Sequence, residues 1–164
     1  MKYRALGDKK LLTCLENAAG NANYRSGKIQ NEIINIVGDY CKEKILENLR
    51  KAKFFSIEFD ETMDVSKSEQ ITIFVRYLDV DGAKCLVREN FAGFVNAFTT
   101  LSDMNPADKF VDLTGQNLGR IILKWVHDNN LDHNNIVSII TDGAFVMTSE
   151  RVGAVKYIKG ICII

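Results

Sequence analysis

Two aspartates, Asp60 and Asp142, are the residues whose positions could support chemistry. Asp60 is the last residue of the strand-like run 54–60, and Asp142 comes directly after a second such run, 135–141. The ends of strands hold side chains rigidly and are where α/β sheets open to ligands. Carboxylate oxygens are the ligands that Mg²⁺ and Mn²⁺ prefer. On neighbouring strands, Asp60 and Asp142 would form a catalytic metal-binding pair suited to phosphodiester chemistry.

The same two aspartates also fit a simpler role as turn formers. Aspartate at the end of a strand commonly begins a turn, and Asp142-Gly143 is a typical turn dipeptide. Spacing alone therefore favours the turn over the metal. Asp64, four residues after Asp60, is assigned to capping or solvation.

The elements that must position these aspartates are predicted from hydrophobic periodicity. Alternating apolar residues and β-branched runs indicate strands, and Asp81-Gly82 indicates a tight hairpin turn between two of them. The run Ile136–Ile140 is almost wholly apolar, which predicts a central strand covered on both faces. The predicted strands are 54–60, 70–79, 85–95 and 135–141.

Helical spacing of apolar residues predicts the remaining elements. An amphipathic helix is expected over 28–50, either continuous or broken near Gly38. Further helices are expected over 114–129 and 149–161, with a loop around Pro106. Residues 1–27 are polar and are predicted to form an irregular lead-in to a single domain, 28–164.

The predicted order is helix, three meandering strands, crossover helix, strand and helix. This is an α/β arrangement with a mixed sheet, and the RNase H-like fold is one of a few α/β folds with that order. We expect a truncated RNase H-like sheet preceded by an amphipathic helix, with its fifth strand missing or improvised from residues 161–164.

Composition limits the classes of function. Lys and Arg together number 21, as do Asp and Glu, so there is no overall positive field to hold nucleic acid. No stretch reaches the length of a membrane helix, so we expect a soluble intracellular protein with no membrane partner. The four cysteines form no C-x-x-C pair, which argues against a zinc knuckle, and are expected to be small apolar residues in a reducing compartment.

Two phrases of the sequence resemble a known family. The first comprises IQNEII from Ile29, FFSIEFDETMDVS from Phe54, and the later pairs Glu69-Gln70 and Arg76-Tyr77; the second is TDGAFVMT from Thr141, followed by Gly153. They lie in the same order in hAT-type transposases and in their zinc finger MYM-type and THAP-type relatives. The resemblance extends over about residues 22–160.

The resemblance implies a function and a set of roles. Asp60 and Asp142 match the first two metal-binding aspartates of a D-D-E catalytic triad in an RNase H-like domain. Members of the family cut DNA beside transposon ends and join the freed 3′-hydroxyl to a target, with Mg²⁺ or Mn²⁺ as cofactor, in the nucleus.

The sequence also departs from the family pattern. The third acid of the triad, a glutamate, lies far downstream in the family, beyond the end of this sequence. The first hypothesis is therefore a transposase catalytic fragment that is inactive alone and binds DNA weakly or not at all. The alternative is a domesticated, non-catalytic module for contacts with DNA, a protein partner or a second copy of itself. A decayed gene product is the third reading.

Overall fold

The computed structural model describes residues 7–17, 26–63, 69–106 and 112–162. The chain divides into two compact units, Met1–Cys41 and Lys42–Ile164. The first contains helix α2 (Lys9–Asn17) and the beginning of helix α3 (Gly27–Lys51). The expectation of an irregular lead-in is therefore wrong for α2, which is a short amphipathic helix.

Helix α3 confirms the predicted long helix and runs through Gly38 without a break. A glycine within a helix lowers helix stability by only about 1 kcal/mol relative to alanine. A helix of 25 residues tolerates this loss. Near its C-terminus, Leu46 and Leu49 are buried in the core of the second unit. The Nε of Arg50 donates a 3.0 Å hydrogen bond to the carbonyl oxygen of Asn129. This end of α3 is thus an integral part of the second unit.

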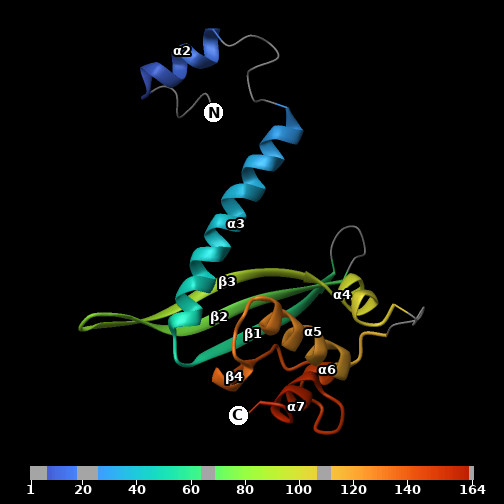
Figure 1. The fold of residues 1–164 in the computed structure, drawn as a ribbon. Coiled ribbons are helices and arrows are strands. Elements are labelled where there is room, and N and C mark those ends of the chain that lie inside the picture. The colour runs from blue at the N-terminus through green and yellow to red at the C-terminus, as the bar shows by residue number, and fades with distance from the viewer. Residues whose placement is uncertain (1–6, 18–25, 64–68, 107–111, 163–164) are drawn as a thin grey trace. The chain divides into compact units, whose positions relative to one another are not determined.

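The second unit is built on a four-stranded mixed sheet with the order β3-β2-β1-β4 (Figure 1). Strand β1 (Phe55–Met63) pairs antiparallel with β2 (Glu69–Asp81) and parallel with β4 (Ile136–Ile140). Strand β3 (Lys84–Asn96) continues the meander beyond β2. The predicted α/β class with a mixed sheet is confirmed.

Strand β4 lies at the edge of this sheet, so the expectation of a central strand is wrong. Its only strand partner among the described residues is β1. Val137 and Ile140 are 50% and 38% exposed, although their apolar character suggested cover on both faces. The fifth strand was expected to be either missing or improvised from residues 161–164. Ile161 and Cys162 form no strand, and residues 163–164 lie outside the described part.

Helices follow the meander and cover one side of the sheet. Helix α5 (Gly115–Asp128) confirms the predicted crossover helix, and the helix expected at 149–161 is the shorter α7 (Ala154–Lys159). Helix α4 (Ala97–Met104) replaces part of the expected loop; its N-terminus is capped by the side chain of Asn96, which accepts a 2.9 Å hydrogen bond from the Thr99 amide. A short 3₁₀ turn, His133–Asn135, leads into β4, and helix α6 (Phe145–Thr148) follows it.

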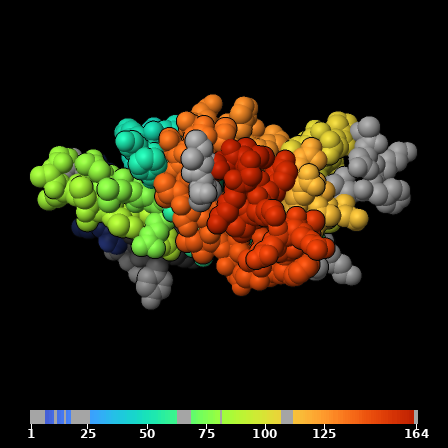
Figure 2. All heavy atoms as spheres, turned by 90° about the horizontal axis from the view of Figure 1, so that it is seen from below, coloured from blue at the N-terminus to red at the C-terminus, as the bar shows by residue number. Residues whose placement is uncertain are grey.

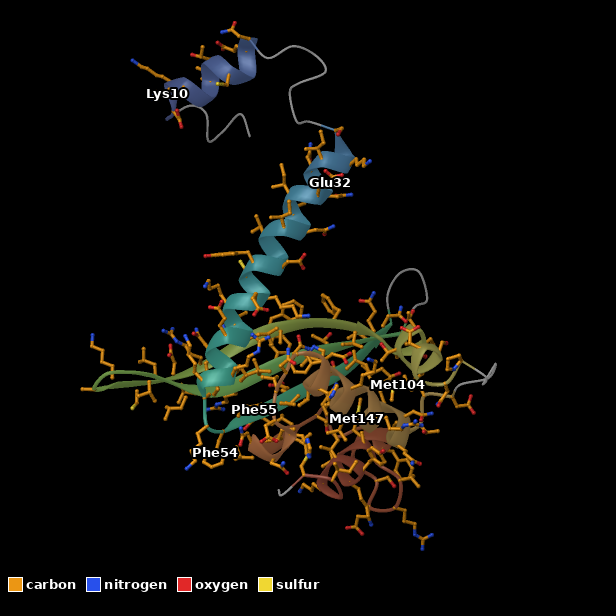
Figure 3. All side chains as sticks on the ribbon, in the orientation of Figure 1. Lys10, Glu32, Phe54, Phe55, Met104 and Met147 are labelled. Carbon is orange, nitrogen blue, oxygen red and sulfur yellow. The ribbon has the colours of Figure 1, made fainter. Side chains whose placement is uncertain are left out.

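The two faces of the sheet differ sharply in exposure. One face, which we call the core face, is covered by α5, and α7 packs on α5; α7 belongs to the red segment at the front of Figure 2. The other is the open face, formed by the alternate residues of each strand. At the start of β1, Phe55 on the core face is 2% exposed, whereas its neighbour Phe54 is 49% exposed (Figure 3). Residues buried on the core face include Ile57, Phe59, Ile71, Ile73 and Val75.

Within the described residues, no helix has the length and apolar character needed to cross a membrane.

The cysteines give a first testable prediction. Cys14, Cys41 and Cys85 are exposed, contrary to the expectation that free cysteines would be buried, and only Cys162 is buried. Burial raises the pKa of the Cys162 thiol, with a smaller contribution from the charge of Asp132. Because the thiolate is the reactive form, we expect three thiols to react rapidly with an aromatic disulfide reagent and the fourth only on unfolding. Four fast thiols in the folded protein would contradict the burial of Cys162.

Candidate functional site

Asp60 lies on β1, three residues before the end of the strand. It stands opposite Thr72 of β2 and is exposed on the open face. The prediction that Asp60 is the last strand residue is wrong, because Glu61, Thr62 and Met63 continue the pairing with the beginning of β2. Its carboxylate is therefore carried by a strand that is paired beyond it, which fixes the local backbone firmly.

Asp142 lies in the turn that follows β4. Its Oδ1 accepts a 3.0 Å hydrogen bond from the amide of Ala144, and Gly143 has a φ of 87°, a conformation that favours glycine. The turn-forming role proposed for Asp142-Gly143 is therefore present. This hydrogen bond uses Oδ1 of Asp142. A carboxylate has a second oxygen, which can accept a further hydrogen bond or bind a cation.

Parallel pairing brings the strands of the two aspartates together. Glu58 of β1 stands opposite Ile140 of β4. Asp60 is two residues beyond Glu58, and Asp142 is two residues beyond Ile140. The condition that the two strands are neighbours is thus met, whereas contact of the two carboxylates through one ion stays a prediction.

Two further acids belong to this end of the sheet and were missed in the sequence. Glu61 follows Asp60 on β1, and Glu69 begins β2 opposite Met63. Burial raises the pKa of Glu61, and the negative charges of three neighbours add to the shift, in the order Glu69, Asp60 and Asp142. We call Asp60, Glu61, Glu69 and Asp142 the acidic cluster.

The acidic cluster contains a polar atom that lacks a partner. The Oε2 atom of Glu69 is buried and has no hydrogen-bond partner among the described residues. A buried carboxylate oxygen costs free energy unless a donor or a cation compensates it. This oxygen and the all-carboxylate donor set fit a hard divalent cation in chemical type. The described residues nevertheless include no group of three His, Cys, Asp or Glu side chains placed to hold a metal ion.

The raised pKa of Glu61 gives a pH-dependent prediction. A carboxyl whose folded pKa lies above its ordinary value of 4.5 adds stability that is fully present below pH 4.5 and is lost as the pH rises through the folded pKa. Glu61→Gln removes this charge. We therefore expect the variant to melt at a higher temperature than the wild type at pH 7, with the difference disappearing at pH 4.

Glu150→Gln is the matched control, because Glu150 is exposed and lies outside the acidic cluster. It should leave the melting temperature unchanged at both pH values. An equal gain for both variants at pH 7 would show that general charge reduction, and not the acidic cluster, is responsible.

Comparisons with known proteins agree with this architecture. Residues 4–153 match the DUF4371 family, described as "ZMYM1/FAM200, RNase-like domain". The protein named "52 kDa repressor of the inhibitor of the protein kinase" is similar over 89 residues, at 29% identity in human and 33% in mouse. That stretch is 54% of this chain but only 11% of each relative. No solved structure matches.

Proposed function

Because the chain belongs to the DUF4371 family of ZMYM1/FAM200 RNase-like domains, we propose that it is the amino-terminal part of a hAT-like transposase catalytic domain. In this proposal, Asp60 and Asp142 bind Mg²⁺ or Mn²⁺. The observation that carries it is the parallel pairing of β1 with β4, which makes neighbours of the strands bearing the two aspartates. The two family phrases in the sequence support the narrower assignment to hAT-like enzymes.

Each residue of the acidic cluster has a distinct part in this proposal. Asp60 supplies oxygen ligands from β1, and Asp142 supplies them from the turn that follows β4. Glu61 and Glu69 add negative charge at the same end of the sheet, and this charge increases the attraction for a cation. A bound divalent ion would supply Lewis-acid activation of a water or a 3′-hydroxyl and stabilise the departing oxygen.

The proposal is tested first by cation binding. Titration with Mn²⁺, followed by paramagnetic broadening of backbone amide signals, should broaden residues near Asp60 and Asp142 selectively. Asp60→Asn and Asp142→Asn should each weaken binding about tenfold or more, because an ion held by few carboxylates loses much of its affinity with one of them. Asp103→Asn, at an exposed aspartate of α4, is the matched control and should bind like the wild type. Undiminished binding by both site variants would refute the metal pair.

Activity is expected to require more than these two carboxylates. A site for two ions needs enough oxygen ligands to fix both metals and hold the phosphate in line, and two aspartates anchor one ion at best. We therefore expect neither DNA cleavage nor strand transfer by this chain in Mg²⁺ or Mn²⁺, and at most weak, salt-sensitive DNA binding. Nicking that is abolished by Asp60→Ala would show that a further ligand, such as Glu58, completes the site.

A second candidate function is a domesticated module that acts through contacts and not through catalysis. The broad apolar surface on the open face favours this alternative, since large exposed apolar patches mark interaction sites. From the family resemblance we also propose a nuclear location, which imaging of a fluorescent fusion would test. Loss of metal binding with a retained interaction would favour the module over the enzyme.

A further inference from the structure

The open face carries two exposed apolar groups on β2 and β3, one on each side of the paired residues Arg76 and Glu89. Register places Leu78 opposite Val87 and Phe74 opposite Phe91. These residues, together with their neighbours, leave much of their surface in contact with solvent: Leu78 is 47% exposed, Val80 60%, Val87 62%, Phe91 44% and Phe94 62%. On the core face of the same strands, Ile71, Ile73 and Val75 are 0% exposed.

A β-bulge concentrates the aromatic residues on this face. Residues three apart in a strand normally point to opposite faces, but Ala92 is an extra residue between Phe91 and Gly93, and Phe91 and Phe94 therefore share the open face. Gly93 adopts a φ of 137°, which favours glycine. The ring centroid of Phe91 lies 5.6 Å from that of Phe74 and 4.9 Å from that of Phe94, in edge-to-face contacts. The strand geometry thus holds three rings together at a surface.

The charges beside this aromatic group are mainly negative. Glu58 stands opposite Phe74, and Asp60 is the next residue of β1 on the same face. Glu89 stands opposite Arg76. Three carboxylates and one guanidinium give this region a formal charge of −2 (1 − 3). Lys53 lies at the other end of the face, with its Nζ 5.3 Å from the ring centroid of Phe54.

This charge distribution decides between classes of partner. Exposed aromatic rings on a sheet can stack nucleic-acid bases, but the carboxylates would repel the phosphates that supply most of the affinity. A second copy of the open face would bring like charges together, which is also unfavourable. A polypeptide with apolar side chains bordered by lysine or arginine complements both the rings and the carboxylates.

We propose that the open face is the docking surface for an amphipathic helix of a protein partner, with an apolar stripe flanked by Lys and Arg. The row from Phe74 to Val80 on β2 contains seven residues, and the six steps between them extend over about 20 Å at 3.3 Å per residue. A helix of about 14 residues has that length. The core face already accommodates α5, a helix of 14 residues. This docking requires neither a metal ion nor catalytic activity, so it can hold whether or not the metal site does.

The proposal is tested with two designed helical peptides of about 14 residues, labelled for fluorescence anisotropy. Both carry leucine at helical spacing; one has lysine and the other glutamate on the polar face. The lysine peptide should bind the full chain at least tenfold more tightly than the glutamate peptide, and its affinity should fall as salt increases. Equal binding of the two peptides would overturn the charge argument.

Variants of the protein locate the binding surface. Phe91→Thr combined with Phe94→Thr introduces β-branched residues, which strands favour. The double variant should weaken binding of the lysine peptide about tenfold or more, because aromatic anchors carry much of the energy of such interfaces. Phe98→Gln is the matched control, since Phe98 is a 41% exposed phenylalanine on α4. It should bind like the wild type. Circular dichroism confirms that each variant is folded.

Two further measurements separate this proposal from its competitors. Glu89→Gln should weaken binding of the lysine peptide two- to fivefold and reduce the salt dependence of that binding. It should leave Mn²⁺ binding unchanged. Single-stranded DNA that competes with the peptide, or a dimer abolished by the double phenylalanine variant, would assign the face to nucleic acid or to a second copy and overturn the proposal. Unchanged peptide binding by the folded double variant would overturn it as well.

Discussion

Replacing Phe59 by alanine should lower the free energy of unfolding by about 3–5 kcal/mol, the usual range for loss of a buried phenylalanine. Phe59 is 0% exposed and lies on β1 between β2 and β4. It stands opposite Ile73, also fully buried, so the cavity would open in the centre of the core face. Urea unfolding followed by circular dichroism measures the change.

Phe94→Ala is the matched control for this substitution. Phe94 has the same side chain on the same sheet but is 62% exposed on the open face. Most of the Phe94 ring is already in contact with water, so its truncation removes little buried apolar area. The expected loss in the free energy of unfolding is therefore under about 1 kcal/mol. If the two variants lost equal stability, the division of the sheet into a core face and an open face would be wrong.

That division could largely be predicted from the sequence, because a strand places alternate residues on opposite faces. The alternation of Phe55, Ile57 and Phe59 with polar residues gave both the position of β1 and its buried face. The end of the strand could not be predicted in this way. Glu61 and Thr62 carry no turn signal, and their pairing with the beginning of β2 extends β1 past Asp60.

The location of β4 at the edge of the sheet was beyond pattern reasoning for a different reason. An apolar run indicates that a strand avoids water, but it does not say which element covers each face or edge. Val137 and Ile140 are apolar and yet substantially exposed. Helix α4 was missed because its eight residues are few for a periodic signal; the signal that would have revealed it is the capping asparagine, Asn96.

The candidate site was predicted in part. Asp60 and Asp142 were identified from their positions at the ends of predicted strands. The prediction required those strands to be adjacent, and the parallel pairing of β1 with β4 meets this condition. Glu61 and Glu69 were missed, since their approach depends on the register between β1 and β2 and not on any local motif. Residues that are brought together by strand register can be identified only once the pairing of the strands is known.

The second large effect is expected at Gly115, the first residue of α5. A Cβ atom there would meet the backbone carbonyl oxygens of Val152 and Val146, closer than any real contact allows, and the Cα of Gly153 at 2.8 Å. Backbone atoms cannot rotate away as side chains do, so α6 and the loop after it would have to separate from α5. We expect Gly115→Ala to cost about 2–4 kcal/mol, beyond the usual cost of overpacking because backbone must move.

Gly38→Ala provides the matched control, with the opposite sign. Gly38 lies within helix α3, and a Cβ there would meet nothing within 4 Å. Alanine is the better helix former by about 1 kcal/mol, so this variant should keep or increase the helical circular dichroism signal and should not lower the unfolding midpoint in urea. The same chemical change would then destabilise one helix and favour another. The difference isolates the close approach of α5 to α6 and to the loop after α6 as the reason why residue 115 is glycine. A harmless Gly115→Ala would show that this approach is not tight.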